Sequence, residues 1–418
     1  MVSVFQIGWR MRYAVPRALE RKSMLSRLYT DLCQEGSMQT VIKYLSPVFP
    51  PTWMEKWEAR RTELPGERIV DYPFVALRSK FSGLAIKNEA DSCRHFMRWD
   101  ERIGNKVLRD LKQDTCDFIY LFNTAAYTVL RGNRSVKGIL EQCSLPYSTY
   151  REAVIRESAK YPDWTNYSTP VTGADSEIKE FIHREESEWT LAEKIVCPSV
   201  HVAQDLSQKG IDPNKITIIP YGFNYGIVPK LRQIKKNSRL RVGTVGYLSI
   251  RKGIHHFYQT ILKYPVAEYV AVGPRGFDLT DSGMELLADK CRLTGQLSSR
   301  SMESEYKSMD VLLFLTIGEG SATVVYEALS LGIPVVTTRS CGSIVEDGVS
   351  GFIVDPDDYD KVVYCLELLS DPDFYGHMSE QAILRSAFGS THAYTDRLIA
   401  YFEGLSTKRS DATQINIQ

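Results

Sequence analysis

The chain has 418 residues, more than one hydrophobic core usually organises, so two domains are expected. Hydrophobic residues make up 43% and charged residues 24%, an ordinary globular balance. Lysines plus arginines number 51, as do aspartates plus glutamates, and this zero net charge argues against a general nucleic-acid binder.

Features of location are few. No apolar run approaches the roughly 18–20 residues of a membrane span, and residues 1–13 lack the layout of a signal peptide. The eight cysteines are scattered singly, so neither a zinc site nor a disulfide framework is indicated, and we expect a cytoplasmic protein. The first 27 residues are strongly basic, opposed by Glu20 alone. This indicates either a solvated helix face or a surface for an anionic acceptor or the inner face of a membrane.

Short apolar runs alternate with helical patterns, which predicts an α/β fold with parallel sheets and crossover helices. In the first half the predicted strands are 2–6, 26–31, 68–72, 117–122, 137–141, 194–198 and 215–220. The predicted helices of this half are 89–112, 147–160 and 175–193, and segment 158–173 is a predicted loop.

A second alternating set follows a charged connector. Its predicted strands are 240–246, 267–273, 310–316, 333–338 and 351–354, and its predicted helices are 253–263, 283–289, 302–308, 322–331 and 358–370. This pattern predicts an N-terminal domain at 1–220, a linker at 221–239 and a C-terminal domain at 240–390. A last helix is predicted at 393–405, with a flexible tail at 406–418.

Segment 318–336 combines two glutamates with a strand–loop–helix–strand pattern. On the predicted helix, Glu327 shares a polar stripe with Thr323, opposite a broad apolar arc. Glu319 lies in the preceding loop, at the carboxyl edge where open α/β sheets bind ligands. Ser321 is expected to cap the helix, and Gly332 stands where a C-terminal glycine belongs. From the spacing alone, two unrelated surface charges are an equal alternative.

Segment 242–253 offers a second half of the same site. Arg251 and Lys252 follow a strand and precede a helix, so these adjacent cations can neutralise a diphosphate, although surface charge is the alternative. Carboxylates accept hydrogen bonds from sugar hydroxyls, whereas cations and helix amides hold phosphate. A nucleotide sugar needs both.

At this point the sequence resembles a known family. EGSATVVYEALSLGIPVV, followed by SIVEDGVSGFIVDP, is similar to the donor-site signature of family 4 retaining glycosyltransferases, two glutamates with seven residues between them. The resemblance extends through GYLSIRKG, AVG at 271–273 and LTGQLS at 293–298, and thus covers the C-terminal domain. It implies the GT-B fold, two Rossmann-like domains facing each other across a cleft, with the last helix crossing back to the N-terminal domain.

The resemblance also implies roles. Glu319 would face the donor sugar near the reacting carbon, Glu327 would hold the ribose hydroxyls, and Lys252 would hold the diphosphate. No metal and no cofactor besides the donor is implied; UDP is the first expected nucleotide and GDP the second. The further donor-site residues are Gly246, Tyr247, Gly273, Leu293, Thr294, Gly320, Ser321, Ala322 and Thr323.

Two departures from the family concern charged groups. Its usual arginine, five residues before the lysine, is Tyr247 here, and Arg251 is the expected substitute. Its usual histidine is missing from the N-terminal domain, where Glu141 or Gln142 takes that place; a glutamate that merely caps helix 147–160 is an equal alternative. A turn residue is likewise the alternative for Asn123. The cleft candidates, whose arginines indicate an acidic or phosphate-bearing acceptor, are Gly8, Arg10, Arg12, Tyr13, Arg17, Asn123, Glu141 and Gln142.

The function predicted from the sequence is transfer of a hexose from a nucleotide diphosphate to an acceptor hydroxyl with retention of configuration. Polysaccharide, glycolipid or small-glycoside synthesis is the expected context. One alternative is a catalytically silent module that binds nucleotide sugars, and another is a non-transferring GT-B enzyme such as an epimerase or phosphorylase. An oxidoreductase is disfavoured, because no G-x-G-x-x-G follows a strand.

Overall fold

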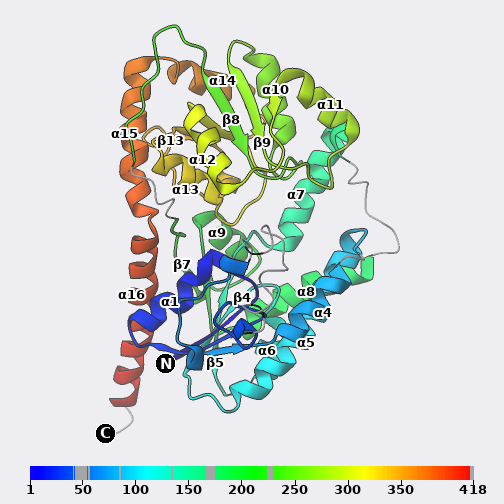
Figure 1. Cartoon of the computed structure of the whole chain (residues 1–418), viewed down its shortest axis with the longest axis vertical. Coiled ribbons are helices and arrows are strands. Elements are labelled where there is room, and N and C mark those ends of the chain that lie inside the picture. The colour runs from blue at the N-terminus through cyan, green and yellow to red at the C-terminus, as the bar shows by residue number, and fades with distance from the viewer. Residues whose placement is uncertain are drawn as a thin grey trace.

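The computed structural model describes residues 1–40, 42, 54, 57–83, 86–133, 135–165, 175–223 and 229–414. Residues 166–173 of the predicted loop 158–173, residues 224–228 of the predicted linker and residues 415–418 of the predicted tail therefore lie outside the described residues. Two parallel sheets organise the chain (Figure 1). Their strand orders are β3-β2-β1-β4-β5-β6-β7 and β10-β9-β8-β11-β12-β13.

The first sheet belongs to the N-terminal half. Its strands are β1 (Val2–Gln6), β2 (Leu25–Thr30), β3 (Ile69–Asp71), β4 (Phe118–Phe122), β5 (Lys137–Glu141), β6 (Lys194–Cys197) and β7 (Ile216–Ile218). The helices of this half are α1 (Ala14–Arg21), α4 (Pro73–Gly83), α5 (Glu89–Leu111), α6 (Tyr127–Gly132), α7 (Tyr147–Lys160), α8 (Asp175–Leu191) and α9 (Val200–Gln208).

The second sheet belongs to the C-terminal half. Its strands are β8 (Arg241–Val245), β9 (Glu268–Val272), β10 (Arg292–Leu293), β11 (Val311–Phe314), β12 (Val335–Thr337) and β13 (Gly351–Ile353). The helices are α10 (Ile254–Lys263), α11 (Asp281–Lys290), α12 (Ser299–Ser308), α13 (Thr323–Ser330), α14 (Tyr359–Leu368), α15 (Pro372–Phe388) and α16 (Thr391–Gln414).

Each strand predicted from the sequence has a counterpart, because the central strands are continuous apolar runs buried on both faces. All five residues of β1 and of β4 are buried, for example, as expected of parallel strands covered by helices. The pattern did not predict the two-residue β10, nor α4, α6, α9 and α15. Helix α16 continues to Gln414, so a helix occupies residues 406–414, where a flexible tail was predicted.

Helix α16 joins the two halves. It runs from the C-terminal half along the N-terminal half and passes beside α1 (Figure 1). Its Phe402 is buried, with the ring 5.7 Å from that of Tyr120 on β4 in an edge-to-face arrangement. Burial of such aromatic pairs stabilises the return of the chain to the first domain.

Helix α7 makes a second connection, from the other side. It leaves the first domain, and the short helix Pro162–Trp164 that follows it contacts α11 of the second (Figure 1). The buried Trp164 ring, just beyond α7, lies 5.1 Å from that of Tyr258 on α10. The Oγ1 of Thr280, which caps α11, donates a hydrogen bond to the Asp163 carbonyl.

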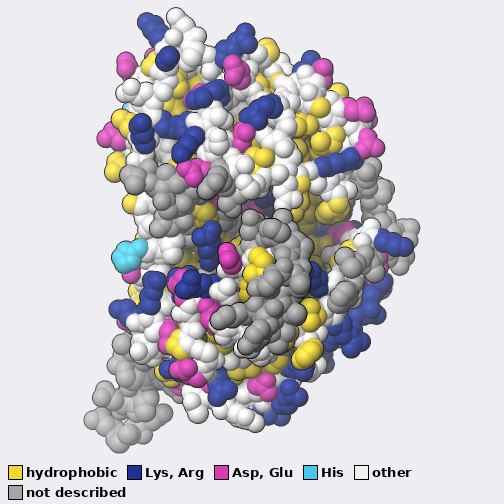
Figure 2. Space-filling view, viewed as in Figure 1, with side chains coloured by type: hydrophobic (Ala, Val, Ile, Leu, Met, Phe, Trp, Pro, Cys, Tyr) yellow, Lys and Arg dark blue, Asp and Glu magenta, His cyan; other side chains and the backbone are white. Residues whose placement is uncertain are grey.

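The outer surface is mixed in charge. On the face shown in Figure 2, basic and acidic side chains are interspersed, in keeping with the zero net charge. Within the described part of the chain, no helix is both long and apolar enough to cross a membrane.

Candidate nucleotide-sugar site

The turn between β8 and α10 presents Arg251 and Lys252. Gly253 ends this turn in the left-handed region, with φ of 73°, and a Cβ there would lie 1.9 Å from the Leu315 carbonyl oxygen. Only glycine can therefore occupy position 253 without moving the end of β11. This close approach sets the two cations directly beside the loop that follows β11.

Glu319 lies in that loop and meets both cations. Its Oε1 is 2.7 Å from Lys252 Nζ and also forms an ion pair with Arg251 Nη1. Arg251 donates a further hydrogen bond of 3.2 Å to the Gly318 carbonyl. The two segments identified in the sequence thus meet at the carboxyl edge of the second sheet, as predicted.

The electrostatics of this cluster favour an anion. Burial lowers the pKa of Lys252, and the neighbouring Glu319 opposes that shift by stabilising the ammonium. Two cations share one carboxylate, so the cluster keeps a net positive charge. Aromatic rings extend this environment: Arg251 lies over Tyr150 of α7, with 5.9 Å between guanidinium carbon and ring centre, and Lys252 Nζ lies 5.3 Å from the Phe314 ring.

The loop carrying Glu319 is held against the N-terminal domain. Ser199 Oγ donates a hydrogen bond of 2.7 Å to the Gly320 carbonyl, and a Cβ at Gly320 would lie 1.9 Å from the Cys143 carbonyl oxygen. The amide of Glu319 donates to Ser340, and that of Ala322 donates to Cys341. The Ala322 amide is therefore engaged, which removes it from the predicted donor contacts.

Helix α13 differs from its prediction at the first turn. It begins at Thr323, with Ala322 at the N-cap and no side-chain cap. Ser321 is buried and its hydroxyl is hydrogen-bonded to Tyr326 at 2.7 Å, so the expected Ser321 cap is wrong. The end is as expected: Gly332 has φ of 68° and its amide donates to the Leu329 carbonyl, a glycine-ended helix.

Glu327 lies on the polar stripe of α13 and not among the residues that the helix buries in the core. The Tyr306 hydroxyl of α12 donates to its Oε2 at 2.5 Å. Burial raises the pKa of Glu327 to about 7, against the opposing effects of Tyr306 and of Arg12. Arg12 belongs to the N-terminal domain, so groups from both domains influence the pKa of Glu327. The sequence had given no reason to select Tyr306, since a tyrosine on a short helix is more often core.

The remaining donor candidates also gather at the carboxyl edge of the second sheet. Leu293 and Thr294, at the end of β10, are partly exposed, and the Thr294 amide donates to the Ala271 carbonyl. Tyr247 is 62% exposed just beyond β8. Gly246 and Gly273 close the same edge: a Cβ at Gly273 would lie 2.0 Å from the Gly246 carbonyl oxygen.

Comparison with known proteins bears on this architecture. Residues 239–371 match the family described as Glycosyl transferases group 1. Sucrose-phosphate synthase from Thermosynechococcus elongatus has a similar structure, with a TM-score of 0.62 and 13% identity over 97% of this chain and 99% of that one. The HepE protein of Anabaena, solved in complex with UDP-glucose, is similar with a TM-score of 0.59. The two share 14% identity over 96% of this chain and 99% of HepE. The chain has the GT-B fold.

A relative found by sequence matches a smaller share of the chain. The capsular polysaccharide biosynthesis glycosyltransferase CapM of Staphylococcus aureus is 27% identical over 175 residues, which are 37% of this chain and 46% of CapM. The chain thus matches about half the length of that relative. The family match likewise covers the C-terminal domain of this GT-B chain, where the two glutamates lie.

In the N-terminal domain of this GT-B protein, the loop after β1 presents two arginines. The Gln6 side chain donates to the Gly8 and Arg10 carbonyls at 3.1 and 2.9 Å, which shapes the loop. Arg12 is exposed, with φ of 49°. Arg10 is also exposed, yet its guanidinium carbon lies 5.3 Å from the Phe122 ring centre, within the field of Glu141. Arg12 is therefore open to an anion, while the Arg10 guanidinium also contacts Phe122 and is hydrogen-bonded to Tyr221.

The structure places two other candidates of this loop elsewhere. Tyr13 is fully buried and its hydroxyl donates to the Leu32 carbonyl at 3.3 Å, so it is a core residue. Arg17 lies on α1 and forms an ion pair with Glu63. The sequence placed these residues after the first strand, but it could not show which of them are buried in the core.

Glu141, Asn123 and Gln142 are likewise buried rather than open to a ligand. Glu141 accepts hydrogen bonds of 2.7 Å from both Tyr120 and Tyr221. The side-chain amides of Asn123 and Gln142 each donate to Glu185 of α8 at 2.9 Å. Their arrangement braces the ends of β4 and β5.

Glu185 also shows which glutamate caps α7, the role considered above for Glu141. Its Oε2 accepts the Tyr147 amide at 2.7 Å, so Glu185, not Glu141, caps α7. Glu188, one turn later, accepts the amides of Thr124, Ala126 and Tyr127 at the start of α6. Two glutamates three residues apart in the predicted helix 175–193 were the available signal for this buried acidic face.

Proposed function

We propose that this protein is a retaining glycosyltransferase that takes a hexose from a UDP-sugar. The observation that carries the proposal is the cluster in which Arg251 and Lys252 share Glu319 at the ligand edge of the sheet. The spacing from Glu319 to Glu327 follows the two-glutamate pattern of family 4. The similarity to HepE, whose structure contains UDP-glucose, supports a uridine nucleotide as donor.

In this proposal the donor diphosphate takes over the two cations. Arg251 and Lys252 bind its oxygens, and the pairing with Glu319 loosens. The freed carboxylate accepts hydrogen bonds from the sugar hydroxyls, while Glu327 accepts them from the ribose. Leu293 and Thr294 border the base, and the amides of Gly320, Ser321 and Thr323 are candidates for the sugar and phosphate.

The reaction breaks the bond between the anomeric carbon and the diphosphate oxygen and forms a bond from that carbon to the acceptor oxygen. Negative charge grows on the leaving diphosphate, where Arg251 and Lys252 stabilise it and replace the metal ion other transferases use. The acceptor approaches from the face that the diphosphate leaves, and its proton passes to the leaving phosphate. Glu319 positions the sugar and is not a nucleophile.

The acceptor is the less defined partner. Arg10 and Arg12 are the exposed cations of the loop after β1, and Arg12 acts on Glu327 across the domains. We propose that they bind an acidic or phosphate-bearing acceptor. The buried Glu141 and Asn123 support that surface from below rather than contacting the acceptor.

The test is calorimetric titration of the full chain with UDP-glucose, UDP-N-acetylglucosamine, UDP-galactose and GDP-mannose, followed by measurement of slow donor hydrolysis. We expect a UDP-sugar to bind at or below millimolar concentration. Lys252→Ala should lower the turnover per donor bound by about 10²–10³-fold, the usual effect of removing one stabilising group from a developing charge. Transfer to an acceptor should preserve the anomeric configuration by proton NMR.

A matched pair on α12 provides the control. Lys307 and Glu303 form an exposed ion pair in the same domain, so Lys307→Ala should leave binding unchanged. Failure of every nucleotide sugar to bind at millimolar concentration would overturn the transferase proposal. Binding without hydrolysis or transfer across a broad acceptor panel would identify a silent binding module instead.

A further inference from the structure

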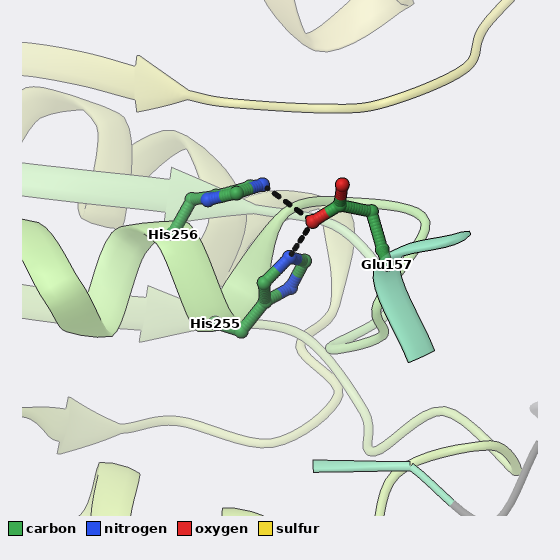
Figure 3. A group of neighbouring side chains, drawn as sticks. All are labelled: Glu157, His255 and His256. Carbon is green, nitrogen blue, oxygen red and sulfur yellow. Dashed lines mark hydrogen bonds and ion pairs between the residues drawn. The ribbon is translucent and has the colours of Figure 1, made fainter. Parts of the chain in front are cut away.

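Two consecutive histidines and one glutamate meet where the domains join. Glu157 lies on α7 of the N-terminal domain, and His255 and His256 lie in the first turn of α10 (Figure 3). Both histidines are fully buried, and the Glu157 side chain is 12% exposed. Both imidazoles point toward the same carboxylate oxygen in Figure 3.

The distances within the cluster suit a bound ion. Glu157 Oε2 lies 3.2 Å from His255 Nε2 and 3.3 Å from His256 Nε2. A tetrahedral ion bound at about 2.0–2.1 Å separates two of its ligand atoms by about 3.3 Å. The three ligand atoms all lie within 4.8 Å of one another, and among the described residues no other group of three possible ligands is that close.

One nitrogen of the cluster is poorly satisfied without an ion. His256 Nε2 is buried, aims at Glu157 and has no hydrogen-bond partner among the described residues, since its contact with Oε2 lacks hydrogen-bond geometry. Its other nitrogen, Nδ1, lies 2.8 Å from the Tyr359 hydroxyl. Buried polar nitrogens are almost always bonded, and a cation between His256 Nε2 and the carboxylate would satisfy both atoms.

The surroundings prepare the three groups as ligands. His255 is fully buried, and the Tyr161 ring packs against its imidazole with 4.6 Å between ring centres. The carboxylate of Glu157 is likewise held in place by an ion pair. Lys160 Nζ takes the other carboxylate oxygen at 3.0 Å, which leaves Oε2 facing the histidines. The Tyr359 contact orients His256 as an outer hydrogen bond orients a metal-bound imidazole.

We propose that Glu157, His255 and His256 bind a divalent transition-metal ion of the Zn²⁺ type that fastens α7 to α10. Two imidazoles and one carboxylate form a ligand set for such ions, with a fourth position left for water on the exposed side of Glu157. The ion would link the two domains and fix α10 immediately after Lys252. Its role is structural, and it takes no part in the proposed transfer reaction.

The test measures metal binding directly, on the full chain without an affinity tag and after removal of metals by chelation. We expect one equivalent of Zn²⁺ to bind by calorimetry at pH 7.5 and to raise the Tm. Co²⁺ should give the intense visible absorption of a four-coordinate ion. Glu157→Gln and His256→Gln should each weaken Zn²⁺ binding by at least about 10-fold, the lower end of what metal sites lose even for an outer contact.

An exposed pair on α16 supplies the control. His392 lies 3.5 Å from Asp396 and its side chain is 87% exposed, so His392→Gln should leave Zn²⁺ binding unchanged. Circular dichroism of the chelated variants checks that they fold, and the Co²⁺ spectrum of the unmodified chain needs no variant. Absence of a stoichiometric Zn²⁺ site, or equal losses in His392→Gln and His256→Gln, would overturn the proposal. Neither result bears on nucleotide-sugar binding, so the two proposals fail separately.

Discussion

Lys252 Nζ lies 2.7 Å from Glu319 Oε1, and the same oxygen pairs with Arg251. The carboxylate therefore occupies the place where an anionic ligand would meet the two cations. Since all three side chains are largely buried, removing one of them leaves its partners in a poorly solvated position. In the proposed function, a donor diphosphate and Glu319 would therefore compete for the same cations.

This competition predicts opposite effects of one substitution on binding and on turnover. Glu319→Gln removes the competing charge, so UDP should bind more tightly, by about 3–10-fold. Donor turnover should fall by about 10²–10³-fold, because the sugar loses a positioning carboxylate. Calorimetry with UDP and a hydrolysis assay with the UDP-sugar measure the two effects. Glu303→Gln, which frees only the exposed Lys307, should change neither.

Arg251 is expected to bind the diphosphate in place of the usual family 4 arginine, whose position is occupied by Tyr247 in this chain. Arg251→Ala should reduce the kcat/KM for the donor by about 10²-fold or more, because one cation at the leaving diphosphate is lost. Arg275→Ala is the matched control: Arg275 pairs with Asp281 on the exposed surface of the same domain. Should the two variants lose equal activity, Arg251 is not a diphosphate ligand.

The C-terminal site could be predicted from the sequence because it is local. Arg251, Lys252 and Glu319 lie in the loops that follow the buried strands β8 and β11, and parallel strands bring their carboxyl ends to one edge. The preceding apolar runs also made β8 and β11 easy to recognise. The register between strand and loop then left little freedom in where these side chains point.

The burial of Tyr13 and Glu141 could not be predicted from the sequence, for a complementary reason. Whether Tyr13 or Glu141 faces a ligand or the core depends on partners distant in the chain, such as Leu32 and Tyr221. The Glu157 cluster joins residues 98 positions apart, on helices from different domains, so no spacing in the sequence could show it. The short β10 was missed because two residues carry no periodic signal.

Glu327 predicts a pH dependence of donor binding. Its pKa of about 7 means that the carboxylate, the form that would accept the ribose hydroxyls in the proposed function, is lost as the pH falls through 7. Donor affinity should therefore rise between pH 6 and pH 8 in the unmodified protein. Glu327→Gln should bind more weakly at pH 8 and show a flat profile over this range. An equally steep profile in that variant would assign the titration to another group.

The same group predicts a change in stability. Its folded-state pKa, about 7, is above the ordinary value of 4.5, so between these pH values the folded protein holds more protons than the unfolded chain. The contribution of Glu327 to the free energy of unfolding therefore falls as the pH rises from 4.5 to 7. Glu327→Gln, which keeps an acceptor for Tyr306, should raise the Tm at pH 8 and leave it unchanged near pH 4.5. Calorimetric scans at both pH values measure this difference.

Contact between the domains at Gly320 leaves no room for a side chain at that position of the Glu319 loop. A Cβ at position 320 would lie 1.9 Å from the Cys143 carbonyl oxygen, and backbone must move to relieve that overlap. Gly320→Ala should therefore lower the free energy of unfolding by about 1–3 kcal/mol, as overpacking does, and reduce donor turnover. Gly376→Ala is the control, since nothing lies within 4 Å of a Cβ there and the position is inside α15. That variant should be stabilised by about 0.5–1 kcal/mol through its higher helix propensity. Equal stability of the two variants in urea would mean that the Glu319 loop is not held against the N-terminal domain in solution.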